Sequence, residues 1–418
     1  MSHATLTAAI EDWLIRKALS DPDIRSLFER LCNRLRGVGI PLDRAALSWP
    51  TLHPLFRAEQ AFWYPDKGAH LEQYYHSSAG NEHWVKSPFH FVLENALDNL
   101  RRRLTGPSAV LDFDVLHSFK EQGYTDYLMT STGFHIAERE TFDNGRTGIM
   151  ASWMTKRENG FSDDDLEALR RIQSIFAVAC RASIQRRVMR NIGDTYLGPT
   201  AARDVLSGEI KRGDGDRLRA VVWFSDLRGS TRLSDTMDPD SYLSLLNKYY
   251  ECTAQPVIDH GGEILNFIGD GVLAIFPIEA ECPIDAAKKA EAAVRKSLQL
   301  REEAEAAGTP GGAPLRFGVG LAIGEVMFGN IGVPQRLAFS GIGKVVNTVT
   351  RVEAATKTVG APVLALPSFV EAAPGAWTKA GKIEIADFDK EVDVYTLEGL
   401  QTSGTSVSRA VSVGTPAE

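Results

Sequence analysis

Residues 263–278 read EILNFIGDGVLAIFPI and decide the fold of the C-terminal half of this chain. Two apolar runs flank a Gly-Asp-Gly turn, a pattern that predicts two strands joined by a tight hairpin. A third apolar run, RAVVWFSD at residues 219–226, also ends in an aspartate that is followed by a glycine-containing turn. Because the apolar residues before each aspartate are expected to be buried, we expect Asp226 and Asp270 to emerge at the rim of one sheet.

Helical and strand-like segments alternate on both sides of this hairpin. The sequence predicts helices at residues 241–260, 285–307 and 344–360. Strands are expected within 315–332 and at 336–343. An apolar run at 361–368, a further helix and a strand at 393–399 follow. Gly/Pro-rich loops separate several of these segments, as in GTPGGAP after the second helix. The pattern predicts one α/β domain.

The N-terminal half differs in composition. Of the seven tryptophans five precede residue 190, and of the nine histidines eight do. Strand-like runs (AALSW, AVLDF and TGIMASWM) alternate with helical stretches such as IEDWLIRKALSDPDIRSLFERLCNRL, which favours a separate α+β domain. At 418 residues, the chain has the length of two domains of roughly 100–200 residues each.

A helix is expected to connect the two halves. Ser162 is its candidate N-cap, and three aspartates follow at the positive end of the helix dipole. An a/d-type apolar stripe then comprises Leu166, Leu169, Ile172, Phe176 and Ala179. The stripe predicts packing against a partner helix, such as the same helix of a second chain; the alternative is packing within its own domain.

Composition excludes several classes of protein. The net charge of −8 disfavours nucleic acid as the main partner, because the negatively charged phosphate backbone binds basic protein surfaces. No apolar run approaches the roughly 18 residues that span a bilayer, and the N-terminus lacks the core of a signal peptide. The four scattered cysteines fit reduced thiols. We therefore expect a soluble, cytoplasmic protein without a membrane span.

Three elements carry candidate chemistry. Paired carboxylates from Asp226 and Asp270 can hold magnesium ions that leave positions open for phosphate oxygens. After the first aspartate, the turn residues Leu227, Arg228, Gly229, Ser230 and Thr231 lead toward a helix, and their backbone N–H groups can cradle phosphates. Asn347 and Arg351 share one helix face, where an amide and a guanidinium suit a triphosphate and a developing oxyanion. Taken singly, the turn after Asp226 also fits a helix cap, the Gly-Asp-Gly segment fits a simple hairpin turn, and the Asn347 and Arg351 pair fits solvated surface.

Together and in this order, these motifs resemble a known family. FSDLRGST, GEILNFIGDGVLAIF and GIGKVVNTVTRVE are similar to the catalytic motifs of the class III nucleotidyl cyclases, over roughly residues 215–398. The resemblance implies a ferredoxin-like α+β catalytic domain with a central, mainly antiparallel sheet and flanking helices. It also implies a homodimer in which each active site is shared across the interface.

The resemblance assigns roles by position. Asp226 and Asp270 match the ligands of two metal ions, Mg²⁺ or Mn²⁺, and the backbone carbonyl of Leu227 joins them. Asn347 matches the residue that orients the ribose, and Arg351 matches the one that stabilises charge at the α-phosphate, both from the opposite subunit. The implied reaction is attack of the ribose 3′-hydroxyl of ATP on the α-phosphate, with pyrophosphate leaving.

The base-selecting positions depart from the family pattern. Adenylyl cyclases usually carry lysine, and guanylyl cyclases glutamate, where this chain has Asn266; Ser340 stands where aspartate or threonine is common. Serine keeps a hydroxyl, and asparagine offers both a donor and an acceptor. We favour ATP, with GTP or a pyrimidine nucleotide as the alternative. Lys390 is the candidate for the lysine that contacts the triphosphate.

The N-terminal half resembles, more faintly, a GAF sensory domain, which implies an unidentified small-molecule ligand. The resulting domain prediction is a GAF-like domain at 1–162, a helical connector at 163–214, the catalytic domain at 215–400 and a disordered tail at 401–418. Two sets of residues admit a ligand but more simply fit core or surface: the histidines His70, His76, His83 and His90, and the aromatic residues Trp63, Tyr64, Tyr74, Tyr75 and Trp84.

Three functions therefore stay open from the sequence. The preferred hypothesis is an adenylate cyclase regulated by its N-terminal domain. The second keeps the fold but makes cyclic GMP or a cyclic pyrimidine nucleotide. The third is a nucleotide-binding module that signals without catalysis.

Overall fold

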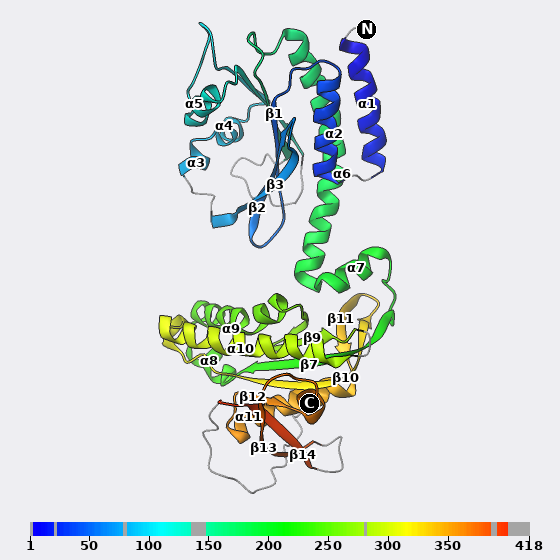
Figure 1. The fold of residues 1–418 in the computed structure, drawn as a ribbon, viewed down its shortest axis with the longest axis vertical. Coiled ribbons are helices and arrows are strands. Elements are labelled where there is room, and N and C mark those ends of the chain that lie inside the picture. The colour runs from blue at the N-terminus through cyan, green and yellow to red at the C-terminus, as the bar shows by residue number, and fades with distance from the viewer. Residues whose placement is uncertain are drawn as a thin grey trace. The chain divides into compact units, whose positions relative to one another are not determined.

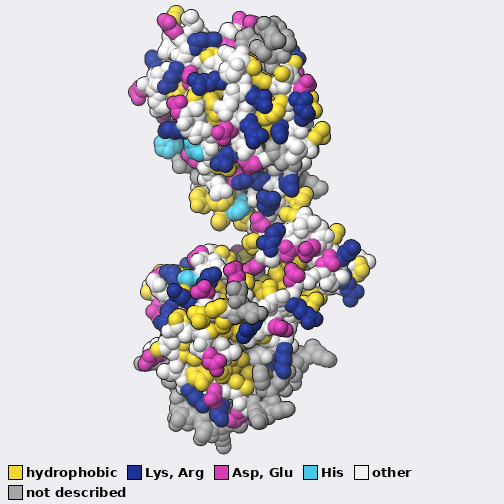
Figure 2. Space-filling model, turned by 45° about the vertical axis from the view of Figure 1, so that its right-hand side comes forward, with side chains coloured by type: hydrophobic (Ala, Val, Ile, Leu, Met, Phe, Trp, Pro, Cys, Tyr) yellow, Lys and Arg dark blue, Asp and Glu magenta, His cyan; other side chains and the backbone are white. Residues whose placement is uncertain are grey.

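A computed structural model describes residues 3–20, 23–77, 82–134, 148–279, 282–385 and 391–399. The chain divides into two compact units, Met1–Tyr196 and Leu197–Glu418. In the part that the structure describes, no helix is both long enough and apolar enough to cross a membrane. On the face that Figure 2 shows, acidic and basic side chains are interspersed over each unit.

The first unit is built on a six-stranded antiparallel sheet in the order β3-β2-β1-β6-β5-β4. The strands are β1 (Arg44–Pro50), β2 (Phe56–Tyr64), β3 (Gly68–Tyr75), β4 (Asn99–Arg103), β5 (Asp126–Gly133) and β6 (Gly148–Thr155). The helices are α1 (His3–Leu19), α2 (Ile24–Gly37), α3 (Glu82–Val85), α4 (Pro88–Glu94), α5 (Asp114–Glu121) and α6 (Asp163–Leu197). Figure 1 shows α1, α2 and α6 on one side of the sheet and α3, α4 and α5 on the other.

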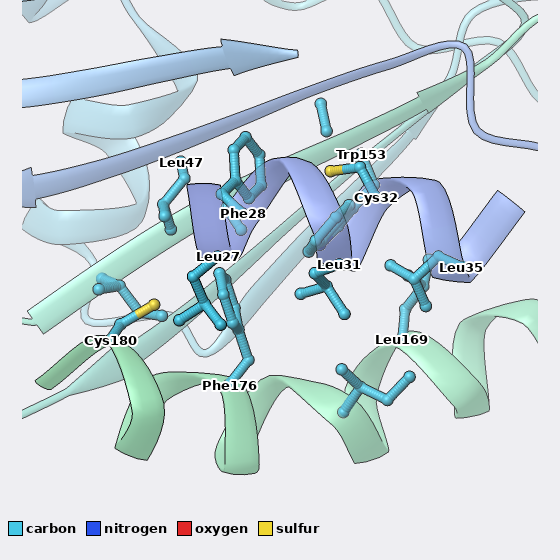
Figure 3. Close-up of a cluster of buried hydrophobic side chains, with 14 of the residues drawn as sticks. Leu27, Phe28, Leu31, Cys32, Leu35, Leu47, Trp153, Leu169, Phe176 and Cys180 are labelled. Carbon is cyan, nitrogen blue, oxygen red and sulfur yellow. The ribbon is translucent and has the colours of Figure 1, made fainter. Parts of the chain in front are cut away.

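Strand alternation divides the first unit into two cores. Trp49, Trp63 and Trp153 point toward α2 and α6 and are at most 1% exposed. Figure 3 shows Leu27 and Phe28 of α2 between the sheet and α6. The opposite face packs a smaller cluster against α4 and α5, centred on Val92, Leu100, Leu116, Tyr127 and Met129. Two of the three strand-like runs are strands, whereas AVLDF at 109–113 makes only an isolated bridge at Ala109.

The apolar stripe of α6 packs inside its own unit. Its five residues are at most 5% exposed, and all belong to the core that α6 forms with α2 and the sheet: Leu166, Leu169, Ile172, Phe176 and Ala179. The prediction that this stripe contacts a partner helix of a second chain is therefore wrong. An a/d spacing records only that one helix face is apolar, and the sheet supplied a nearer apolar surface.

The second unit is built on an eight-stranded, mainly antiparallel sheet. Its order is β13-β14-β12-β10-β7-β9-β8, with β11 paired to β10, and among its described strands only β10 and β12 pair in parallel. The strands are β7 (Gly215–Leu227), β8 (Glu263–Ile268), β9 (Gly271–Pro277), β10 (Phe317–Val333), β11 (Arg336–Ile342), β12 (Val363–Ala365), β13 (Trp377–Glu384) and β14 (Glu391–Leu397).

Helices cover both faces of this second sheet (Figure 1). They are α7 (Pro199–Ser207), α8 (Ser230–Thr236), α9 (Pro239–Asp259), α10 (Pro283–Ala307), α11 (Lys344–Val359) and α12 (Pro367–Val370), with a 3-10 turn at Pro310–Gly312. Val221 and Trp223 of β7 pack toward α9 and α10, whereas Ala220 and Val222 pack toward α11. The expectation of a mainly antiparallel sheet with flanking helices is confirmed.

Candidate active site

Neighbouring strands bring the two aspartates together. Asp226 is the penultimate residue of β7, and Asp270 lies in the two-residue loop between β8 and β9. Because Ser225 pairs with Val272, the end of β7 lies beside the β8–β9 hairpin. Burial, and then the neighbouring Asp270 carboxyl, raise the pKa of Asp226 to about 6. The predicted carboxylate pair is thus one site at the rim of the sheet.

The Asp270 turn is held by its own geometry and by a tyrosine. Gly269 has a φ of +60°, which suits glycine at the first position of a tight hairpin turn. The Tyr250 hydroxyl donates to the Gly269 carbonyl at 2.7 Å, and the Tyr250 ring packs edge-on against Phe267 with centroids 4.7 Å apart. These contacts fix the loop that presents Asp270. The hairpin interpretation and the site interpretation of this motif are therefore compatible.

The two carboxylates fit a bound cation. Asp270 Oδ2 is buried and has no hydrogen-bond partner among the residues that the structure describes. Asp226 Oδ2 lies 3.5 Å from Lys357 Nζ, the cation that partly offsets the charge of the pair. The described residues contain no group of three or more His, Cys, Asp or Glu side chains able to hold a metal. A site with two carboxylates suits Mg²⁺, which keeps positions for waters and substrate phosphates.

The turn after Asp226 has the predicted form. Gly229 has a φ of +77° and directly precedes α8, whose first residues are Ser230 and Thr231. One predicted phosphate donor is already used, because the Arg228 backbone N–H donates to the Arg316 carbonyl at 2.8 Å. The Arg228 guanidinium is half-buried and donates to the Ala361 carbonyl at 3.3 Å, and burial lowers its pKa. Phosphate binding by the turn stays a prediction, as does the metal role of the Leu227 carbonyl.

Helix α11 carries the third motif along its length. Lys357 meets Asp226, whereas Arg351 and Asn347 lie six and ten residues earlier on the same helix. At 1.5 Å per residue, these offsets are about 9 and 15 Å along the axis. Asn347 is exposed and Arg351 is half-buried. Within one chain, Asn347 therefore lies well away from the aspartates.

Two α11 residues beside Asp226, Lys357 and Glu353, were not predicted from the sequence. Glu353 lies against Gly318, the β10 residue that pairs with Asp226, and is 2% exposed. Burial, followed by the charge of Asp226, raises the pKa of Glu353 to about 7. The available signal was the four-residue spacing of Glu353 and Lys357, which puts them on one helix face. Only the packing of α11 on β10 shows that this face meets Asp226.

The predicted base-selecting residues lie on neighbouring elements. Asn266 is an exposed residue of β8, and Ser340 is a half-buried residue of β11. Gly341, which follows Ser340, lies against the side chain of Leu265, which precedes Asn266. The two strands therefore bring Asn266 and Ser340 near each other. Their role in base selection stays a prediction. Lys390 lies outside the residues that the structure describes, as does the predicted tail at 401–418.

Comparisons with known proteins identify a family that matches most of the second unit. Residues 217–362 match the family described as the adenylate and guanylate cyclase catalytic domain, a range that includes Asp226, Asp270, Asn347 and Arg351. An adenylate cyclase of Anabaena cylindrica is 31% identical over 182 residues, which are 43% of this chain and 36% of that protein. Adenylate cyclase 1 of Rhizobium meliloti is 30% identical over 153 residues, which are 36% of this chain and 22% of that protein.

The chain thus spans little more than a third of the first relative and less of the second. A crystal structure of an adenylyl cyclase from P. aeruginosa is 25% identical to this chain. The match covers 46% of this chain and 99% of that one, with a TM-score of 0.38.

Proposed function

We propose that this protein, whose C-terminal unit contains an adenylate and guanylate cyclase catalytic domain, is an adenylate cyclase that converts ATP to 3′,5′-cyclic AMP and pyrophosphate. The observation that carries the proposal is the pairing of Asp226 with Asp270 at the sheet rim, inside the matched range. Two adjacent, half-compensated carboxylates suit a reaction that gathers a triphosphate and divalent cations.

The residues of this chain divide the chemical work. Bound Mg²⁺ or Mn²⁺, two per site, would supply charge neutralisation at the phosphates and a more acidic 3′-hydroxyl. Asp226 and Asp270, with the Leu227 carbonyl, would hold these ions. The turn at residues 228–231, and Lys390, would bind the phosphate chain. Arg351 would stabilise negative charge at the α-phosphate, since a guanidinium supplies permanent charge and fixed donors.

The proposed active sites are composite sites of a homodimer. Asn347 lies about 15 Å along α11 from the lysine that meets Asp226, and this separation supports a site to which two chains contribute. A second copy that contributes its Asn347 and Arg351 completes the set. Each dimer would then hold two equivalent sites, because a two-fold interface repeats every contact.

Adenine is the proposed base. Asn266 supplies both an amide donor and a carbonyl acceptor, and Ser340 supplies a hydroxyl, so the pair can meet the amino group and a ring nitrogen of adenine. The rival hypothesis of a different cyclic nucleotide rests on the same two residues, because an amide can be turned to meet another base edge.

The first unit is the proposed regulator, a GAF-like sensory domain. Its six-stranded antiparallel sheet with helices on both faces supports this proposal. So does its long exit helix, which is tied to the sheet by Arg187 of α6 and Glu59 of β2 through two hydrogen bonds of 2.5 and 2.6 Å. A ligand that shifts this helix has a mechanical route to the alignment of composite sites.

The testing experiment incubates the full-length protein separately with ATP, GTP, CTP and UTP, with Mg²⁺ or Mn²⁺, and resolves the products by chromatography. Cyclic AMP is the expected main product. Asp226→Ala should reduce turnover by more than about a hundredfold because a metal ligand is lost. Asp259→Ala, at an exposed carboxylate near the end of α9, is the matched control and should keep wild-type activity.

Each other outcome selects a rival. A different cyclic nucleotide would keep the metal chemistry and overturn the base assignment. Binding of ATP without any product would favour the non-catalytic module. Unchanged turnover in Asp226→Ala would refute the site itself.

A further inference from the structure

The first unit contains a cavity on the sheet face opposite α2 and α6. It has a volume of about 360 Å³, within the range of small-molecule sites. Strand residues form its floor and residues of α3, α4 and α5, with their flanking loops, form its walls. The lining includes Arg44, Phe62 and Ser152 from the sheet, and Phe89, Asp114 and Phe119 from the walls.

A buried arginine stands in the floor of this cavity. Arg44 is the first residue of the central strand β1 and is only 9% exposed. Its guanidinium carbon lies 5.3 and 4.8 Å from the ring centroids of Phe62 and Phe119. Its Nε donates to the Tyr64 hydroxyl at 3.2 Å, and Nη1 approaches the Met154 sulfur at 3.3 Å. All these contacts are to neutral groups.

The positive charge of Arg44 has no carboxylate partner within 4 Å in the part of the chain that the structure describes. Burying an ion without a counter-ion costs several kcal/mol, and aromatic faces return only about 2 kcal/mol of it. By contrast, the buried Glu59 on the opposite sheet face is paired with Arg187. The cavity beside Arg44 is therefore where the missing negative charge fits.

The other lining residues define what kind of anion fits. Lys86 is paired with Glu82 and is largely exposed, so Arg44 is the buried fixed cation of the lining. The Asp114 carboxylate, also in the lining, is exposed and therefore screened by solvent, and it disfavours a dianion more than a monoanion. Phe62, Phe89 and Phe119 offer ring faces and edges to a flat apolar body.

From these observations we infer that the cavity binds a small monocarboxylate with an aromatic ring, its carboxylate on the guanidinium of Arg44 and its ring among the phenylalanines. A carboxylate matches the planar donor fork of arginine, and one negative charge balances one positive charge. Ser152 and Gln60, on the same floor, supply polar groups beside the carboxylate. The inference concerns the first unit and does not depend on the catalytic assignment.

The test measures binding to the full-length protein by calorimetry and by ligand-observed NMR. The probes are benzoate, phenylacetate and indole-3-acetate, with benzamide as the uncharged counterpart of benzoate and phenyl phosphate as the dianion. Arg44→Met removes the charge at similar length. Arg30→Met, the same change at an exposed position of α2, is the matched control.

At least one carboxylate should bind the wild-type protein, and Arg44→Met should weaken it at least tenfold while Arg30→Met leaves it unchanged. Benzamide should bind at least tenfold more weakly than benzoate if benzoate is the carboxylate that binds. Absence of binding by all three carboxylates would overturn the inference, as would equal binding by Arg44→Met. Tighter binding of phenyl phosphate would overturn the carboxylate assignment.

Thermal unfolding separates binding from folding. Arg44→Met should unfold at the wild-type temperature or above it, because the substitution removes an unpaired buried charge. A clear decrease would assign Arg44 a structural role and contradict the inference. If Arg44→Met does not fold, Arg44→Lys tests the same point: it keeps the charge but loses the planar fork, and the carboxylate should bind it between twofold and tenfold more weakly.

Discussion

Mixing two inactive variants tests whether the sites are composite. Asp270→Ala removes a metal-side residue, and Arg351→Ala removes a residue about 9 Å along α11 from the lysine that meets Asp226. If each site takes its aspartates from one subunit and Arg351 from the other, a heterodimer of the two variants holds one intact site and one doubly mutated site. Random pairing of equal amounts makes half of all dimers heterodimers, so about a quarter of the sites become intact.

The assay is cyclic nucleotide formation after the two purified variants are mixed and allowed to exchange subunits. Each variant alone should be inactive, and the mixture should reach about a quarter of wild-type activity. The matched control mixes Asp226→Ala with Asp270→Ala. Both changes lie on the metal side, so each subunit brings a damaged aspartate pair and no site is restored. An inactive test mixture, or recovery in the control mixture, would refute the shared geometry.

Three further predictions follow from the described contacts. A proton and a metal ion compete for Asp226, whose pKa is raised to about 6. The apparent Mn²⁺ affinity, measured by titration, should therefore be constant well above pH 6 and about tenfold lower at pH 5. An affinity that does not change with pH would contradict the site. Arg187→Met removes the ionic partner of the buried Glu59, which keeps only its hydrogen bonds from Trp49 and Gln73, and should lower the free energy of unfolding by about 3 kcal/mol. A loss below about 0.5 kcal/mol, typical of an exposed pair, would show that the pair is solvent-screened. Gly320→Ala places a methyl carbon 2.6 Å from a backbone carbonyl of α11 and should lower the free energy of unfolding by about 1–3 kcal/mol in denaturant titrations. Gly381→Ala, with open space around it, is the control. Equal stabilities of the two variants would show that α11 shifts to make room for the methyl group.

The sequence predicts the central strands and helices of the second unit well because their patterns are local. The run at residues 219–226 lies in β7, where successive residues pack against opposite faces of the sheet. The Gly-Asp-Gly turn forms a two-residue hairpin loop. The segment after residue 366 is different. The further helix expected there is only α12, and β13 was not predicted. Trp377–Glu384 pairs with β14, the next strand along the chain, but its own residues lack the apolar alternation that predicts a strand.

The candidate site divides in the same way. Asp226 and Asp270 could be placed at a rim from sequence, because each follows an apolar strand and strand ends gather at sheet edges. The neighbours that adjust their charge could not. Lys357 meets Asp226 only because α11 packs along β10 with glycines at Gly318 and Gly320, where a methyl group would collide with the helix. That register is a property of two packed surfaces and not of either segment.

In each of the two ligand sites proposed above, a charge is only partly balanced by the protein, and the two charges have opposite signs. In the second unit, the exposed lysine Lys357 offsets part of the charge of the Asp226 and Asp270 carboxylates. In the first unit, Arg44 is buried among aromatic rings, and no carboxylate of the described residues lies within 4 Å of it. Each arrangement costs folding free energy that a neutral residue would not. In each unit, a bound group of opposite charge would offset part of that cost. A bound cation does so in one unit and a bound carboxylate in the other, and each should stabilise its own unit against unfolding in proportion to ligand concentration.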